Sequence, residues 1–331
     1  MVQQELQESL LILLLQLVDR LPLPSVSQAK GAGRPKHYRD HLFLKALVIM
    51  IVKRLHRVHE LLAVLEQPTT EMQRLRALLE ENGRYPSRRT FERRLAALPD
   101  SLPAQIGCLG RHLVALIEPW ATCGRAVAMD STVLRAKDGA VWHKKDREAG
   151  VVPHSRIDTE AGWTKSGWHG WVYGWKLHLC AVVADVWIPL AAKLTPANTD
   201  DGEQARELLP EVPLEARYLL GDQHYNREDL RANCHLRGME LVTSQPGKYP
   251  HRDAGVEVRR VFHKLRSLAM ENLNEHFKGI FEVHGPVPTK GRVATARFAL
   301  GAVLVYQLAV WYRFESEMTL NCGLKHFLRA A

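Results

Sequence analysis

The stretch RAVAMDSTVL, residues 125–134, is an apolar and β-branched run interrupted by one aspartate, and it predicts a short strand that ends near Asp130. The stretch EARYLLGD, residues 215–222, repeats this arrangement and ends at Asp222. Carboxylates at the carboxyl ends of strands in an α/β sheet lie where ligands gather. Each aspartate taken alone also suits an ordinary turn or a helix N-cap.

The segments around these two runs predict further strands and helices in alternation. Strands are predicted by GWVYGWKLHLCAVVAD (170–185), IPLAAKLTP (188–196) and MELVTS (239–244). Helices are predicted over 200–212 and 226–238, and from about residue 261 onward. The order of three strands followed by helices and strands in turn predicts a mixed α/β sheet with helices on its faces.

The first part of the chain, by contrast, predicts helices only. Residues 41–67 form a long segment rich in Leu, Ile and Val without Gly or Pro. Residues 71–83 predict a helix ended by Gly83, and a short helix follows that begins at the N-cap Ser87. We therefore expect a helical region over 1–120, an α/β domain over 121–315 and a C-terminal tail over 316–331.

Basic residues are concentrated in the helical region. The 331-residue chain carries a net charge of +9, and a basic protein of this size often meets a polyanion. One cluster extends from Lys30 to Arg57, and a second includes Arg88, Arg89 and Arg93 on the polar side of the predicted helix. Two such clusters favour a phosphate-binding surface, although a solvated basic face explains either cluster alone.

Residues 135–170 predict an irregular insertion loop with basic and aromatic side chains. The candidate DNA contacts in it are Trp142, Lys144, Lys145, Trp163 and Trp168. A long structureless segment in a compact domain usually works on a ligand, and aromatic rings can stack on unpaired bases. The alternative is that the Trp side chains are partly buried at the edge of the sheet.

Composition excludes several other classes. The five cysteines form no CxxC pair, so neither a disulfide framework nor a zinc site is indicated, and a reducing cytoplasm is expected. The apolar runs at 9–18 and 298–312 are shorter than the ~20 residues that span a bilayer, so we interpret both as buried helices and expect no membrane contact. No P-loop or GxGxxG motif is present, so no nucleotide cofactor is expected.

A third carboxylate candidate lies in MENLNEHFKGIF, residues 270–281. Glu271, Glu275 and Lys278 share one helical face, and taken alone this pattern favours a solvated salt-bridge stripe. Two strand-end aspartates and a helical glutamate, however, form a ligand set for a pair of Mg²⁺ ions, which prefer oxygen ligands. Two such ions can activate a nucleophilic oxygen and stabilise the leaving oxygen in phosphodiester displacement.

These segments together resemble the DDE transposases of bacterial insertion sequences, which have an RNase H-like catalytic domain. AMDST (128–132) resembles the first-Asp strand, and residues 174–201 resemble the β-hairpin and its following turn. LLGDQHYN (219–226) resembles the second-Asp strand, and 270–281 resembles the third-acid helix, in which Glu271 and Lys278 have the E-x6-K spacing.

The chain also departs from the family pattern. The Tyr and Arg that often precede the glutamate by seven and four residues are Lys264 and Ser267 here, with Arg266 one residue out of register. A Gly that commonly follows the second Asp is replaced by His224. These departures concern the subgroup more than the three acids.

The resemblance implies a transposase that binds element ends and catalyses Mg-dependent strand cleavage and strand transfer. It implies that Asp130, Asp222 and Glu271 hold two Mg²⁺ or Mn²⁺ ions. Lys278 would contact a terminal phosphate. Further DNA contacts are expected from Arg266, His224 and Tyr225. A structural role is also open for His224.

The partners that the resemblance implies are terminal inverted repeats and target DNA, both double-stranded, and a second copy in a homodimer. The expected location is the bacterial cytoplasm, in association with the nucleoid. Three alternatives stay open: an RNase H-like nuclease or integrase without transposition, a non-catalytic DNA-binding protein derived from a transposase, and a basic structural scaffold.

Overall fold

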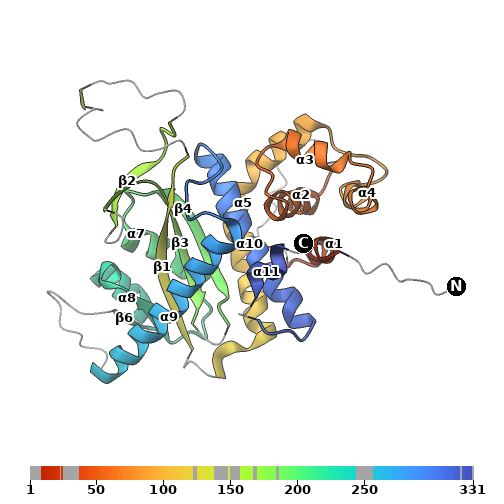
Figure 1. Ribbon diagram of the computed structural model, residues 1–331. Coiled ribbons are helices and arrows are strands. Elements are labelled where there is room, and N and C mark those ends of the chain that lie inside the picture. The colour runs from red at the N-terminus through yellow and green to blue at the C-terminus, as the bar shows by residue number, and fades with distance from the viewer. Residues whose placement is uncertain are drawn as a thin grey trace.

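The computed structural model contains one mixed sheet with helices on both faces (Figure 1). It describes residues 9–22, 24, 37–121, 125–137, 148–149, 157–166, 170–183, 186–243, 256–320 and 323–329. The strands of the described chain are β1 (Ala126–Arg135), β2 (Gly162–Ser166), β3 (Gly170–Val182), β4 (Pro189–Pro196), β5 (Tyr218–Gly221) and β6 (Glu240–Thr243). The predicted α/β class is confirmed.

The sheet is antiparallel on one side and parallel on the other. β3 pairs antiparallel with β1 along one edge, and its other edge pairs with β2 over its first residues and with β4 over its last. β5 pairs parallel with both β1 and β6. The order β4-β3-β1-β5-β6 therefore places the two predicted Asp-bearing strands, β1 and β5, side by side at the centre.

Helices cover both faces of this sheet. In the β1–β3 ladder, Asp130 pairs with Leu179 and Ser131 with His178, and because successive residues alternate, Asp130 and His178 lie on opposite faces. α7 (Asp201–Leu208) covers the face of His178, and α9 (Val256–Phe281) crosses the face of Asp130. α8 (Glu228–Leu236) connects β5 to β6.

The helical region precedes the sheet, as predicted. Its helices are α1 (Leu10–Asp19), α2 (Asp40–Val52), α3 (Val58–Leu65), α4 (Thr70–Ala77) and α5 (Arg88–Ile117). α5 and α10 (Arg292–Glu315) lie between the sheet and α1–α4 (Figure 1). α11 (Leu324–Arg329), in the predicted tail, packs on α9.

α10 is the central helix of the core. It contacts β4 as well as α1, α2 and α5, so the expected regions 1–120 and 121–315 share one apolar interior. α10 is long and apolar enough to cross a membrane, yet 78% of its most apolar window is buried inside the protein. α1 is likewise mostly buried. Both apolar runs are therefore buried helices, as expected.

Several predicted boundaries were wrong. The segment 41–67 is two helices, because the chain turns between α2 and α3, where Arg54 has a φ of 57°. α4 ends well before Gly83. α5 does begin after the N-cap Ser87 but continues through Pro99 and Pro103, since a buried stripe of leucines holds it against the core.

Two strand predictions also need correction. β1 does not end near Asp130 but continues to Arg135, because its later residues keep pairing with β3. The insertion loop over 135–170 is not wholly irregular, since β2 forms within it and pairs with the start of β3.

Candidate metal and DNA site

The two strand aspartates occupy equivalent positions on neighbouring strands. β1 and β5 run parallel with Ala128 paired to Leu220, so continuing this register by two residues sets Asp130 beside Asp222. Register partners in a parallel pair lie about 4.8 Å apart and point to the same face. The sequence prediction that these two carboxylates lie together is consistent with this register.

Asp130 is held by two polar side chains of α9. Asn274 donates a hydrogen bond from Nδ2 to Asp130 Oδ2 over 3.2 Å, and the Arg266 guanidinium lies 3.9 Å from the same oxygen. Burial raises the pKa of Asp130 to about 6; Arg266 opposes this shift and the charge of Asp222 adds to it. The pKa of Asp130 therefore lies well above the ordinary value of 3.8.

Asp222 begins the short turn that follows β5. Its Oδ1 accepts a hydrogen bond from the backbone N–H of His224 over 2.7 Å, which fixes the direction of the carboxylate. The Tyr225 ring packs over Gly221, where an added Cβ would come within 2.6 Å of the Tyr225 Cβ. Burial, together with the charges of Asp130, Asp201 and Asp222, raises the pKa of Tyr225 well above its ordinary value.

Glu271 lies on the same helix as the two side chains that hold Asp130. It is exposed and stands one turn before Asn274, so its carboxylate projects from the turn of α9 that crosses β1. Glu275 lies 3.7 Å from Lys278 and 4.0 Å from His284. Glu275 thus forms the ordinary salt bridge, as expected, and Glu271 stands between Arg266 and Asn274, the two α9 residues that contact Asp130.

A buried polar cluster supports the opposite face of the sheet. Asp201 at the start of α7 accepts a hydrogen bond from Lys176 Nζ over 2.9 Å, and its other oxygen lies 3.4 Å from His178 Nδ1. His178 Nε2 is 2.8 Å from the Thr195 hydroxyl. Burial lowers the pKa of His178 despite the neighbouring Asp201 carboxylate. Asp201 also adds negative charge near Asp130.

The donors around Asp130 suit a hard divalent cation. Asp130 and Asp222 supply carboxylate oxygens, and Asn274 Oδ1 is buried without a hydrogen-bond partner among the described residues. Carboxylate and amide oxygens are ligands that Mg²⁺ and Ca²⁺ accept. Over the described part of the chain, no three His, Cys, Asp or Glu side chains are gathered closely enough to hold a metal ion, so Glu271 is not yet clustered with the aspartates.

Other predicted DNA contacts have different surroundings. Arg88, Arg89 and Arg93 are exposed on the first turns of α5, and Arg88 also bonds to Glu92 over 2.8 Å. The His224 side chain is exposed, whereas Lys278 is only 21% exposed.

Three of the predicted contacts pack against other residues of the protein. Tyr225 is 3% exposed and packs beneath the site. Arg266 is 11% exposed and faces Asp130. Trp163 stands on β2 with its ring 5.2 Å from that of Tyr173, so it packs at the sheet edge. The remaining predicted contacts, Trp142, Lys144, Lys145 and Trp168, lie outside the described residues.

Sequence reasoning missed two residues that influence Asp130, one by a hydrogen bond and one by its charge. Asn274 stands inside the quoted 270–281 stretch, three residues after Glu271, and that helical spacing was the available signal. Asp201 was assigned only to a helix start. Its contact with the Lys176 and His178 face of β3 depends on the packing of α7, which no local pattern reveals.

A comparison with protein families matches residues 140–285 to the transposase DDE domain. The match begins ten residues after Asp130 and includes Asp222 and Glu271. A search of curated proteins found no match.

Solved structures of transposases show only a weak similarity to this chain. The piggyBac transposase synaptic complex with hairpin DNA is 10% identical with a TM-score of 0.41, covering 96% of this chain and 74% of that one. A pre-cleavage Mos1 transpososome is 12% identical with a TM-score of 0.21, covering 86% and 80%. The Mos1 mariner paired end complex with Mn is 12% identical with a TM-score of 0.21, covering 84% and 78%. At these values the likeness does not by itself carry a functional assignment.

Proposed function

We propose that this chain, whose residues 140–285 match the transposase DDE domain, binds the ends of its element and catalyses divalent-metal-dependent cleavage and strand transfer of DNA. The observation that carries this proposal is the register of β1 and β5, which sets Asp130 beside Asp222 under the turn of α9 that bears Glu271. A carboxylate pair at the centre of the sheet suits metal-dependent phosphodiester chemistry.

In this proposal Asp130, Asp222 and Glu271 hold two Mg²⁺ or Mn²⁺ ions. When bound, such ions activate a nucleophilic oxygen and stabilise the leaving oxygen of a phosphodiester. The protein keeps the Asp222 carboxylate oriented through the His224 N–H, and it keeps Asp130 oriented through Asn274. Glu271 completes the set from the exposed side of α9, where its side chain is free to turn toward the aspartates.

Arg266 and Lys278 have separate roles in the proposal. The Arg266 guanidinium offsets the negative charge of Asp130 before a cation binds. Lys278 stands seven residues beyond Glu271 and therefore on the same side of α9, two turns away, where its ammonium suits a terminal phosphate. Its contact with Glu275 at 3.7 Å is a weak surface pair that a phosphate can replace.

The test is cleavage of end-bearing duplex DNA in the presence of Mg²⁺ by the full chain. Asp130→Asn, Asp222→Asn and Glu271→Gln are each expected to abolish cutting while DNA binding is retained. Glu275→Gln is the matched control, since Glu275 is exposed on the same helix and pairs with Lys278. It is expected to cut normally.

Full cleavage by any one of the three carboxylate variants would remove that residue from the site. Cutting without joining to a target would assign the protein to the nucleases, and specific binding without metal-dependent cutting would make it a non-catalytic DNA-binding protein. Steep salt dependence with equal affinity for random DNA and no cutting would indicate a basic scaffold.

The cellular setting is proposed on the same basis. A homodimer would bring two terminal inverted repeats together, and the element would be a bacterial insertion sequence whose enzyme works in the cytoplasm at the nucleoid. Inverted repeats flanking the reading frame, bounded by short direct duplications, would support this setting. Size-exclusion chromatography with light scattering on end-bearing DNA would count the protomers.

A further inference from the structure

A groove of about 460 Å³ lies where the helical region meets the end of β1. Its walls come from three segments: the start of α3, the start of α5, and residues 288–297 at the start of α10. Lys137, two residues past β1, reaches it and donates a hydrogen bond from Nζ to the Pro288 carbonyl over 3.1 Å. Both parts of the protein therefore contribute to one concave surface, called the basic groove below.

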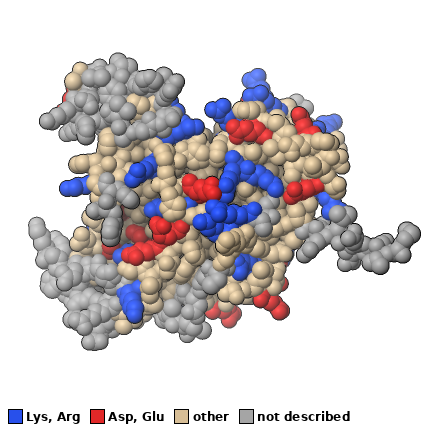
Figure 2. Space-filling view, in the orientation of Figure 1, with Lys and Arg blue, Asp and Glu red and all other residues tan. Residues whose placement is uncertain are grey.

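The charge of the basic groove is unbalanced. Its lining has five Lys or Arg residues, namely Arg57, Arg88, Lys137, Lys290 and Arg297, with His56 and His59 beside them. Glu92 is the acid in this lining, and it bonds to Arg88 over 2.8 Å. Figure 2 shows Lys and Arg side chains gathered along the middle of this face of the molecule, with fewer acidic side chains among them.

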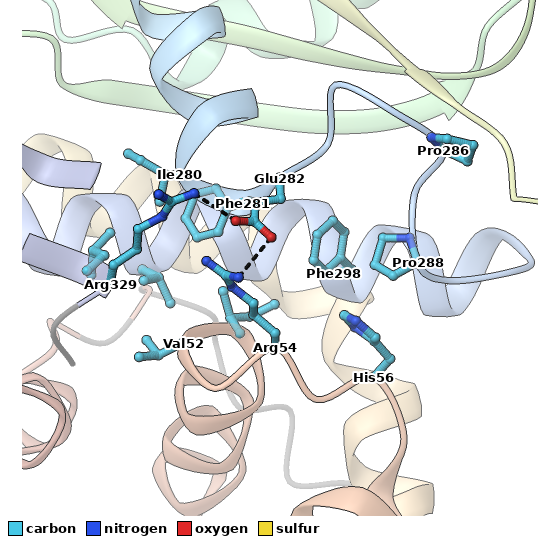
Figure 3. Close-up of a pocket in the computed structure, with 13 residues that line it drawn as sticks. Val52, Arg54, His56, Ile280, Phe281, Glu282, Pro286, Pro288, Phe298 and Arg329 are labelled. Atoms are coloured by element: carbon cyan, nitrogen blue, oxygen red, sulfur yellow. Dashed lines mark hydrogen bonds and ion pairs between the residues drawn. The ribbon is translucent and has the colours of Figure 1, made fainter. Parts of the chain in front are cut away.

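Two other pockets are closer to charge balance. The adjoining pocket shares His56 and Pro288 with the groove, but there Arg54 and Arg329 both bond to Glu282, over 2.8 Å and 2.7 Å (Figure 3). The pocket near the start of β1 sets three Arg against three Glu: Arg111, Arg125 and Arg237 against Glu118, Glu211 and Glu215. The excess of cations is thus largest in the basic groove among these three, with five Lys or Arg against one Glu.

Several contacts hold the groove open and its cations in place. Arg297 is partly buried, and its Nη2 donates a hydrogen bond to the His56 carbonyl over 3.5 Å. Burial lowers the pKa of Arg297, so the chain keeps a cation where it has few groups to solvate it. Glu60, close by, is occupied by the backbone N–H groups of His56 and Arg57, over 2.7 Å and 3.0 Å. A partly buried cation with little local compensation suits a site that an anion completes.

We propose that the basic groove binds the sugar-phosphate backbone of duplex DNA, as a contact shared by the helical region and the α/β domain. The proposal rests on the proposed function and adds to it a specific surface and position. Consecutive phosphates of one strand present the linear array of negative charge that Arg57, Arg88 and Lys137 match from three different segments. Backbone contacts position a duplex without reading its sequence.

The position follows from β1, which connects the groove to the aspartate pair. Lys137 is seven residues after Asp130; five of the seven belong to β1 and the last two follow its end, so the separation below is an upper value. At ~3.3 Å per residue this separation is about 23 Å. For a duplex whose axis runs along β1, with ~3.4 Å of axial rise per nucleotide, the groove contact falls roughly seven nucleotides from the phosphate at Asp130.

The first test uses the full chain without divalent metal and a fluorescein-labelled duplex of arbitrary sequence. Arg57→Gln combined with Arg88→Gln should raise the Kd on the order of tenfold and reduce the slope of log K against log salt by about 1.8, since each lost phosphate contact removes ~0.9. Arg125→Gln combined with Arg217→Gln is the matched control, because both residues are exposed at the opposite end of β1. It removes the same charge and should leave the slope nearly unchanged.

The second test checks the position. A neutral methylphosphonate placed seven nucleotides from the mapped cut should weaken binding by the wild-type chain and not by Lys137→Gln, because that position is calculated for Lys137. The proposal would be overturned if the groove and control variants had equal salt slopes. It would also be overturned if the groove variant lost affinity for duplex RNA but not for duplex DNA. If the wild-type chain fails to cleave DNA but the groove variants still show the expected loss of salt slope, the proposed metal chemistry is wrong and the groove proposal stands. If the wild-type chain binds no duplex, both proposals are wrong.

Discussion

Asp130 and Asp222 lie at the same level of the sheet on parallel neighbouring strands, two residues beyond the pair Ala128 and Leu220. This relationship is set by backbone hydrogen bonds between β1 and β5, so it does not depend on a bound ligand. The two carboxylates repel each other, and the charge of Asp222 helps to raise the pKa of Asp130. A cation between them would remove that repulsion.

The first prediction concerns the pH dependence of metal binding. Because burial raises the pKa of Asp130 to about 6, its ionised form loses population as the pH falls through 6. We expect Mn²⁺ affinity to be nearly constant above about pH 7 and to fall roughly tenfold per pH unit well below 6, since a carboxylate ligand must be deprotonated. Isothermal titration calorimetry of the full chain with MnCl₂, repeated between pH 5 and 8, measures this affinity as a function of pH.

The same shift has a defined sign for stability. The folded-state pKa of Asp130 is raised, so its contribution to the free energy of unfolding is greatest below the unfolded value of 3.8 and is lost as the pH rises through 6. For metal binding, Asp130→Asn should remove the change in Mn²⁺ affinity near pH 6. A wild-type affinity that is flat from pH 5 to 7 would contradict the assignment.

The second prediction concerns Gly221, which ends β5 just before Asp222. A Cβ there would lie 2.6 Å from the Cβ of Tyr225, so Gly221→Ala forces the buried ring away. We expect a loss of about 1–3 kcal/mol in the free energy of unfolding, as overpacking usually gives, together with weaker metal binding because Asp222 moves.

Gly279→Ala is the control for this experiment. Gly279 stands inside α9, and its added Cβ would meet nothing closer than 3.8 Å, so helix propensity should make that variant slightly more stable. Urea unfolding measures both variants. Equal stability of Gly221→Ala and the wild type would show that the Tyr225 contact is not tight.

The third prediction concerns Gln307, a fully buried amide on α10. Its Nε2 donates to the Ile106 carbonyl over 2.9 Å and to the Pro189 carbonyl over 2.8 Å, which joins α5, α10 and β4. Gln307→Leu leaves both carbonyls without this donor, and we expect a loss of about 2 kcal/mol or more in urea unfolding. Gln73→Leu, on the exposed side of α4, should change stability by less than about 0.5 kcal/mol.

The fourth prediction separates phosphate contact from packing at Lys278. Lys278→Ala should reduce the salt slope for binding to end-bearing DNA by about 0.9, and Lys278→Arg should keep most of it, because a positive charge stays at the same place. Lys325→Ala, an exposed lysine on α11, is the comparison. An unchanged slope for Lys278→Ala, with a normal melting temperature, would remove Lys278 from the DNA contacts.

Local sequence patterns predicted the central strands and their acids because burial and alternation mark them directly. Asp130 and Asp222 each follow an apolar run, and parallel pairing then brings them together. β2 was not predicted, since its five residues include Gly162 and Ser166 and its stability comes from pairing with β3. The break near Arg54 was missed because neither Gly nor Pro marks it.

The site itself was less predictable than the strands. The bond from Asn274 to Asp130 joins residues 144 positions apart, so it depends on how α9 crosses the sheet. The burial of Arg266 and Tyr225 follows from the same crossing and from the packing over Gly221. The basic groove draws on α3, α5 and α10, whose meeting is a tertiary property that the charge clusters only suggested.

β1 continues without interruption from the aspartate pair to Arg135, and Lys137 follows two residues later. A paired central strand can neither stretch nor swing, so it would set a fixed distance between the cleavage site at the aspartate pair and the backbone contact in the basic groove. DNA elements cut by this protein would then share one spacing between the cleaved phosphate and the phosphates bound in the basic groove, whatever their terminal sequence. Lengthening β1 would have to break its pairing with β3, so that spacing would be conserved by the fold itself.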